Sequence, residues 1–222
     1  MPSIFEVENY ASVSFQSSGR YAVLGSLHKS TKNVVIAFHG QGQLAKYFIQ
    51  KLKGLQALGI TVIAPEGLHY YYLNGFSGRV GTSWMTSENR LMAIANYISF
   101  LNLMRTDIIS KTNPGIKIHL LGFSQGVATV SRWVEQTKFD FEQLILWGGA
   151  LPPDLNKELI NKRMSGKPLH QVIGKRDPFI DSEKVEDLKL LIEGYGLSAD
   201  YTYYDGVHEI TPDTLLKLFN PY

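Results

Sequence analysis

A serine lies between two glycines at residues 122 to 126, in the sequence GFSQG. The apolar run IKIHLL precedes it and a stretch with valines at 127, 130 and 134 follows, so the pattern predicts a turn from a strand into a helix. In such a turn the serine side chain projects above the sheet, and glycines on either side prevent a clash. Ser124 is therefore a candidate nucleophile, and the backbone N–H of Gln125 is a candidate oxyanion donor. The other interpretation is a glycine-rich turn with an incidental serine.

A second oxyanion donor is predicted in the loop after an earlier strand. The apolar run NVVIAF, residues 33 to 38, is followed directly by HGQGQ, residues 39 to 43. Its glycines would let the backbone approach a substrate oxygen, and the N–H of Gln41 is our candidate donor. We expect the side chain of His39 to bond neighbouring backbone and shape this loop.

A base and an acid are expected after the serine, first the acid and then a histidine. His208 lies in the loop DGVHEITPD at the end of a predicted strand, whereas His170 lies inside the apolar run PLHQVI. We therefore predict His208 as the base and expect His170 to be a hydrogen-bonded core or surface histidine. Asp177 follows PLHQVI in the segment GKRDPFI and is the predicted acid. The competing Asp181 better suits the N-cap of the helix that begins there.

Short apolar runs alternate with helical periods along most of the chain. The predicted strands cover residues 33 to 38, 61 to 64, 116 to 121, 143 to 147 and 168 to 173, and the helical periods cover 44 to 55, 91 to 101 and 185 to 192. This alternation predicts an α/β fold with a mostly parallel sheet and helices on both faces. Two alternating segments, residues 10 to 16 and 21 to 27, predict an antiparallel hairpin before it.

The segment from 66 to 86, EGLHYYYLNGFSGRVGTSWMT, is long for a connection and rich in aromatic residues and glycine. We predict that it bends over the site, with Tyr72, Phe76 and Trp84 forming an apolar wall for an acyl group. Arg79 would meet a polar or anionic substrate group. The other interpretation is that about half of the aromatic side chains cover the sheet edge and that Arg79 is simply solvated.

Composition limits the remaining possibilities. The 222 residues include 22 basic and 20 acidic side chains with no cysteine, which excludes disulfides, thiolate zinc sites and a cysteine nucleophile. The basic residues are scattered, so we expect no nucleic-acid partner, and no apolar run is long enough to anchor the chain in a membrane. We expect one cytoplasmic domain over residues 1 to 222, without metal or cofactor, and a homodimer stays an open alternative.

Four motifs together resemble the α/β-hydrolases, and within them the phospholipase/carboxylesterase family that includes acyl-protein thioesterases. They are HGQG, GFSQG, GKRD and VHEI, in a resemblance that extends from about residue 34 to the C-terminus. The resemblance implies a Ser-His-Asp carboxylic-ester hydrolase that acts on a small-molecule ester. Gln43 stands where eukaryotic thioesterases of this family usually carry aspartate. Two alternatives stay open: an acyl thioesterase with the same three residues, and a hydrolase-fold receptor that binds a ligand without catalysis.

Overall fold

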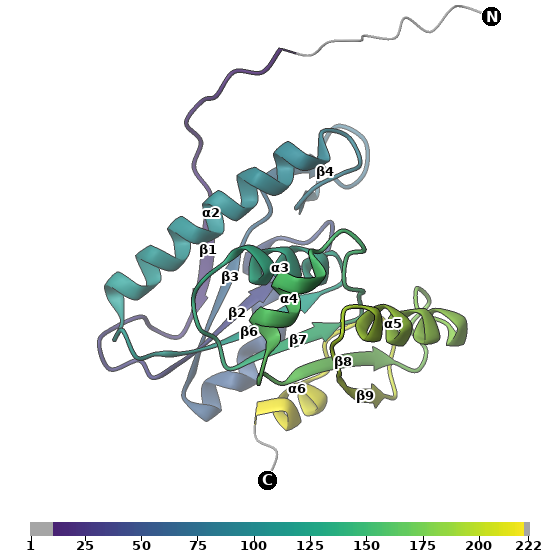
Figure 1. Ribbon diagram of the computed structural model, residues 1–222. Helices are drawn as coiled ribbons and strands as arrows, with labels where there is room; N and C mark the ends of the chain where they lie inside the picture. Colours follow the sequence, from purple (N-terminus) through teal and green to yellow (C-terminus); the bar gives the residue numbers. More distant parts are fainter. Residues whose placement is uncertain (1–10, 220–222) are drawn as a thin grey trace, which may run out of the picture.

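The computed structural model describes residues 11–219 as a central sheet with helices on both faces (Figure 1). The main sheet is built from seven strands in the order β1-β3-β2-β6-β7-β8-β9. Their bounds are β1 Tyr21–Leu24, β2 Asn33–Phe38, β3 Ile60–Pro65, β6 Lys117–Phe123, β7 Gln143–Trp147, β8 Leu169–Gly174 and β9 Asp200–Tyr204. Only β1 runs antiparallel to its neighbour, and all the other pairs are parallel. The predicted mostly parallel sheet is confirmed, and the fold is that of an α/β-hydrolase.

Helices cover the two faces of this sheet. They are α1 Ala45–Phe48, the 3₁₀-helix η1 Ile49–Leu58, α2 Arg90–Lys111, α3 Gln125–Gln136, α4 Lys157–Met164, α5 Ser182–Gly194 and α6 Pro212–Phe219. Apolar side chains of α2, α3, α4 and α5 pack on one face, and those of α1, η1 and α6 pack on the other. Because the central strands are buried on both faces, their sequences read as continuous apolar runs.

The predicted N-terminal hairpin differs from the observed pairing. Residues 11–20 contain no strand, and residue 10 lies outside the described part of the chain. The antiparallel partner of β1 is β3, with Tyr21 opposite Pro65 and Leu24 opposite Val62. In that position Ala22 and Leu24 pack against the core beneath η1. Residues 11–16 have no such face to bury, since Val13 and Phe15 are almost fully exposed, so their alternating pattern stabilises no strand.

A small antiparallel hairpin stands apart from the main sheet. Its strands are β4 His69–Tyr72 and β5 Val80–Ser83, both within the aromatic segment 66 to 86. It lies near the start of α2, beyond the main sheet (Figure 1). The loop after β2 is tied to it, because the Gly42 N–H donates to the Thr82 carbonyl oxygen and the Thr82 N–H donates to that of Gln43. The hairpin therefore borders the carboxyl ends of the parallel strands.

No helix within residues 11–219 has both the length and the apolar character that a membrane crossing requires.

Candidate active site

Ser124 lies at the turn between β6 and α3, as its sequence context predicts. Its backbone has φ 54° and ψ −121°, a positive-φ conformation that is strained for a residue with a side chain. The Ser124 N–H donates to the Trp147 carbonyl oxygen at 2.9 Å, which ties the turn to β7. A Cβ atom on Gly122 would lie 2.6 Å from Val127 Cα, and one on Gly126 would overlap the Phe38 carbonyl. Both flanking positions therefore require glycine.

The loop after β2 lies against this turn. A Cβ atom on Gly40 would lie 3.0 Å from Ser124 Cβ, so the two backbones can approach only with glycine at that position. The Gly40 N–H donates to Gln43 Oε1 at 2.9 Å, which closes the loop on itself. Among the described residues, neither the Gln41 N–H nor the Gln125 N–H donates to a protein acceptor. Both N–H groups are therefore free to bind an oxygen of another molecule.

His39 is a buried scaffold residue, as its sequence position suggested. Its Nδ1 donates to the Gly40 carbonyl oxygen at 2.7 Å, and its Nε2 accepts from the Gly67 N–H at 2.9 Å. Burial lowers the pKa of the imidazole, which favours the neutral ring that this pair of bonds requires. The Trp84 ring stacks on it with centroids 5.0 Å apart. His39 therefore fixes the loop that carries Gln41.

Asp177 and His208 form a close pair at the ends of β8 and β9. His208 Nδ1 and Asp177 Oδ2 are 2.6 Å apart, and the Asp177 side chain is fully buried. The other carboxylate oxygen, Oδ1, accepts from the Phe179 N–H at 2.9 Å. The imidazole lies between the rings of Phe123 and Phe179, with centroids 4.8 and 4.9 Å away. These contacts set the direction of the imidazole and leave Nε2 available to a substrate.

The competing histidine and aspartate have other roles. Asp181 caps α5, since its side chain accepts from the Lys184 N–H at 2.9 Å. His170 lies half-buried on β8, 3.8 Å from Asp200 across the neighbouring strand. Burial lowers its pKa. Neither residue lines the cavity that contains Ser124.

One cavity brings Ser124 and His208 together with the loop after β2. Its volume is about 870 Å³. Within residues 11–219 no hydrogen bond joins Ser124 Oγ to His208, although both side chains line this cavity. The remaining lining residues are Gly40, Gln41, Gly42, Gln43, Tyr71, Leu73, Phe123, Gly148, Gly149, Ala150, Phe179, Ile180, Lys184, Asp187, Leu188 and Leu191. Much of the wall is apolar and comes from α5 and the loop before it.

Sequence reasoning missed this α5 wall. The spacing of Leu188 and Leu191 indicates only one apolar face of a helix, because no local pattern distinguishes a residue that lines a cavity from one that packs in the core. Phe179 and Ile180 follow the predicted acid directly. Their place beside Asp177 was the one signal that could have marked them as part of the site.

The residues predicted to bind substrate do not line this cavity. Trp84 is fully buried, and its Nε1 donates to the His39 carbonyl oxygen at 2.9 Å. Tyr72 is about half exposed on the hairpin, and Phe76 is 98% exposed at its tip. Arg79 lines a different hollow, which shares Gly42 and Gln43 of the loop after β2 with this cavity. From the aromatic segment, Tyr71 and Leu73 reach the cavity instead.

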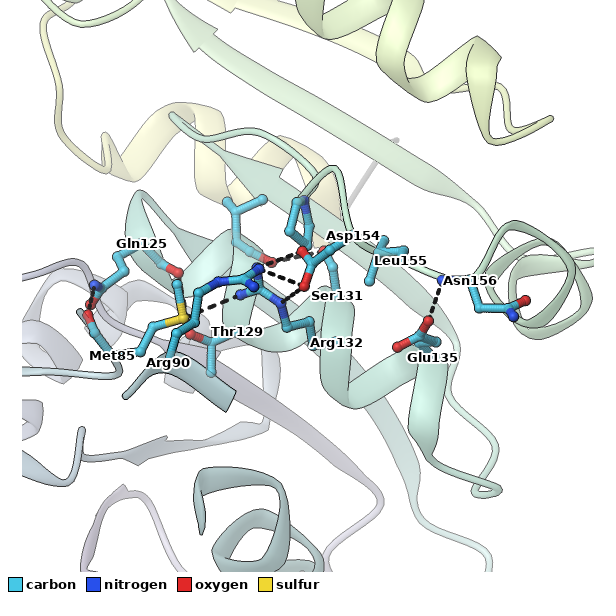
Figure 2. A network of polar contacts seen from close by, with 12 residues as sticks. Met85, Arg90, Gln125, Thr129, Ser131, Arg132, Glu135, Asp154, Leu155 and Asn156 are labelled. Atoms are coloured by element: carbon cyan, nitrogen blue, oxygen red, sulfur yellow. Dashed lines mark hydrogen bonds and ion pairs between the residues drawn. The ribbon is translucent and has the colours of Figure 1, made fainter. Parts of the chain in front are cut away.

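The Gln125 side chain ties the serine turn to the loop after β5. Its Nε2 donates to the Met85 carbonyl oxygen at 2.9 Å, and its Oε1 accepts from the Trp84 N–H at 3.0 Å. Figure 2 shows the contact between Gln125 and Met85 beside an ion-pair network that includes Arg132 of the same helix. There Arg132 Nη2 donates to Asp154 Oδ1 at 2.7 Å, and Arg90 binds the same carboxylate.

That network also sets the charge of its carboxylate. Burial would raise the pKa of Asp154, but the hydrogen bonds from Arg132 and Arg90 outweigh it and the pKa is lowered. Asp154 therefore stays ionised and holds the segment after β7, which carries the cavity residues Gly149 and Ala150, against α3.

Within the described residues 11–219, no group of three or more histidine, aspartate and glutamate side chains is arranged to hold a metal ion.

Comparison with known proteins identifies the family. Residues 20–220 match the model of the Phospholipase/Carboxylesterase family, so the chain belongs to it. Among solved structures, esterase PE8 is similar with a TM-score of 0.68 and 19% identity over 91% of this chain and 96% of that one. Zea mays acyl-protein thioesterase 2 has a TM-score of 0.68 and 19% identity over 90% of this chain and 96% of that one.

A third solved structure is a phospholipase/carboxylesterase from Dyadobacter fermentans, with a TM-score of 0.62 and 19% identity over 95% of this chain and 98% of that one. A comparison with curated proteins gave no match. At these identities the solved structures show the fold alone, and the family match indicates a carboxylesterase-type hydrolase.

Proposed function

We propose that the protein hydrolyses carboxylic esters through an acyl-enzyme formed on Ser124, with His208 as general base and Asp177 as its acid partner. One observation carries the proposal. The His208 imidazole, held 2.6 Å from the buried Asp177 carboxylate, lines the same cavity as a serine in a strained turn. Nucleophile, base and orienting acid are the parts that such a reaction needs.

The reaction follows from these positions. Asp177 accepts a hydrogen bond from the Nδ1–H of His208, so Nε2 carries the free lone pair that takes the proton of the Ser124 hydroxyl. The Ser124 Oγ then bonds to the acyl carbon, and the resulting oxyanion accepts hydrogen bonds from the N–H groups of Gln41 and Gln125. When this intermediate collapses, the bond to the alcohol oxygen breaks and His208 returns its proton to that oxygen. An ester of Ser124 remains.

Water completes the cycle. His208 takes a proton from a water molecule, and the water oxygen bonds to the acyl carbon of the Ser124 ester. The bond from the acyl carbon to Oγ then breaks, the acid leaves, and Oγ recovers its proton from His208. Leu188, Leu191 and Phe179 would hold the acyl chain, because they supply the apolar wall of the cavity.

A thioester substrate is the second candidate. It is favoured by the similarity in fold to Zea mays acyl-protein thioesterase 2. The same intermediate serves both substrates, and only the leaving atom differs, sulfur in place of oxygen. Turnover of butyryl and octanoyl esters beside their thioester counterparts would separate the two candidates.

Fluorophosphonate labelling tests the mechanism directly. The probe should label the wild-type protein at Ser124, and Ser124→Ala should lose both labelling and ester turnover while keeping its melting temperature. Ser77→Ala, at an exposed serine outside the cavity, is the matched control and should label normally. Labelling or turnover that survives in Ser124→Ala would overturn the assignment. A folded wild-type protein that neither labels nor turns over any ester would favour the receptor alternative instead.

A further inference from the structure

A second hollow adjoins the proposed active site and is rich in positive charge. Its volume is about 890 Å³. Its charged lining residues are Lys46 and Lys51, from α1 and η1, and Arg79, which directly precedes β5, with no acidic side chain among them. The other lining residues are Gly42, Gln43, Leu44, Tyr47, Phe48, Gly78 and Val80. We call this hollow the basic groove.

The charges of the basic groove are not neutralised by the protein. Within residues 11–219, neither Lys46, Lys51 nor Arg79 forms an ion pair with an acidic side chain. Lys46 instead lies 4.8 Å from the centroid of the exposed Tyr47 ring. Like charges that line one hollow repel each other and raise its positive potential. An anion that entered the groove would relieve this repulsion.

The groove and the proposed active site share a wall. Gly42 and Gln43 line both hollows. On the hairpin side, Leu73 lines the active-site cavity and Arg79 lines the groove, and the Leu73 N–H donates to the Arg79 carbonyl oxygen at 2.8 Å. A substrate bound at Ser124 could therefore extend past the loop after β2 and reach the cations.

We propose that the basic groove binds an anionic group, a phosphate or a carboxylate, on the alcohol or thiol part of the substrate. This inference rests on the proposed hydrolase function. The apolar wall around Leu188 and Leu191 suits the acyl chain, so the part beyond the loop after β2 is the leaving group. Guanidinium and ammonium groups are the usual protein partners of phosphate and carboxylate oxygens.

Three butyrate esters of substituted phenols test this inference. They carry a para hydroxyethyl, carboxymethyl or phosphonomethyl group, so the acyl group is constant and the methylene spacer keeps the acidity of the phenol similar. We expect wild-type kcat/KM to be about tenfold higher for the two anionic esters than for the neutral one, since three exposed cations each contribute modestly. The preference should shrink in about 0.5 M NaCl through screening.

The combined variant Lys46→Gln, Lys51→Gln, Arg79→Gln should abolish this preference. The control variant Lys53→Gln, Lys138→Gln, Lys157→Gln removes the same charge from exposed positions outside the groove and should keep the preference. Equal kcat/KM for all three esters in the wild type would overturn the proposal. So would a groove variant that loses activity equally on all three. The carboxymethyl and phosphonomethyl esters also show which anion is preferred.

A binding measurement separates this proposal from the catalytic one. Benzylphosphonate should cause saturable shifts of the backbone amide NMR signals of Gly42, Gln43 and Arg79 in the wild type and in Ser124→Ala, and none in the groove variant. If no ester is hydrolysed but these shifts appear, anion binding in the basic groove is supported and the proposed hydrolase function is contradicted. If the wild type hydrolyses esters but benzylphosphonate shifts no signal, only the proposal of anion binding in the basic groove is contradicted.

Discussion

The buried segments that hold Ser124 in place differ from the exposed rim of the cavity. We call the turn at Ser124, the loop after β2 and the loop after β5 the support. The support is buried and cross-linked by polar contacts, for example from Gln125 to the loop after β5 and from His39 to Gly67. The rim, which consists of the β4–β5 hairpin and α1, carries exposed aromatic rings and unpaired cations. A buried polar network tolerates little change, whereas an exposed surface tolerates much. The geometry of the proposed chemistry therefore belongs to the support, and the choice of substrate belongs to the rim and to α5.

The largest effect should follow from crowding the support. In Gly126→Val the new side chain would overlap the carbonyl of Phe38, a backbone atom that cannot move without shifting β2. We expect insoluble protein, or a melting temperature lower by roughly 10 °C or more. Thermal denaturation followed by circular dichroism is the measurement. Gly194→Val is the control, because a Cβ atom there meets no other atom within 4 Å. A stable Gly126→Val protein would show that the support is less rigid than its contacts imply.

Asp177→Asn should leave the fold intact and remove most of the catalytic activity. The amide oxygen can still accept from the Phe179 N–H, but the amide nitrogen would face His208 Nδ1 and favour the wrong tautomer. We expect kcat to fall by about 10³ to 10⁴. Asp181→Asn should change kcat by less than about twofold, because asparagine caps a helix as well as aspartate does. Steady-state kinetics on butyrate esters measures both, and the reverse order would assign the acid to Asp181.

The sequence predicted the support better than the rim, for a physical reason. The turn at Ser124 and the loop after β2 depend on backbone conformations that only particular residues permit, so Gly122 and Gly126 mark them locally. The cap at Asp181 is equally local. The pairing of β1, by contrast, depends on how much apolar surface each possible partner strand can bury. The alternation of residues 10 to 16 carries no information about that burial.

The aromatic segment shows the same limit within the predicted site. Trp84 and Tyr71 lie in one stretch of similar composition, yet Trp84 is in the core and Tyr71 lines the cavity. Which of the two side chains faces the substrate depends on how α2, α3 and the hairpin pack against one another. This arrangement is determined by contacts between elements that are distant in the sequence. No spacing of aromatic residues could have predicted it.

Trp84→Ala tests the reassignment of that residue to the support. The ring packs against Phe38, His39 and Tyr97 without exposure, so its removal leaves a cavity. We expect a loss of about 3 to 5 kcal/mol of unfolding free energy, measured by urea denaturation. Where the variant is folded, kcat/KM should fall alike for acetyl, butyryl and octanoyl esters. A loss confined to octanoyl esters would return Trp84 to the acyl-binding wall that the sequence suggested.

The smallest effect is expected at the tip of the hairpin. Phe76 is 98% exposed and does not line the cavity, so Phe76→Ser removes no buried contact. Its unfolding free energy should stay within about 0.5 kcal/mol of the wild type. Tyr71→Ser is the matched change on the same hairpin, and Tyr71 lines the cavity beside Gly42. It should lower kcat/KM for aryl butyrates more than for methyl butyrate, because Tyr71 borders the loop after β2 on the leaving-group side of the cavity, whereas Phe76→Ser should leave that ratio unchanged. A lower aryl-to-methyl ratio in Phe76→Ser, with stability intact, would mean that the hairpin folds over bound substrate and that the rim includes its tip.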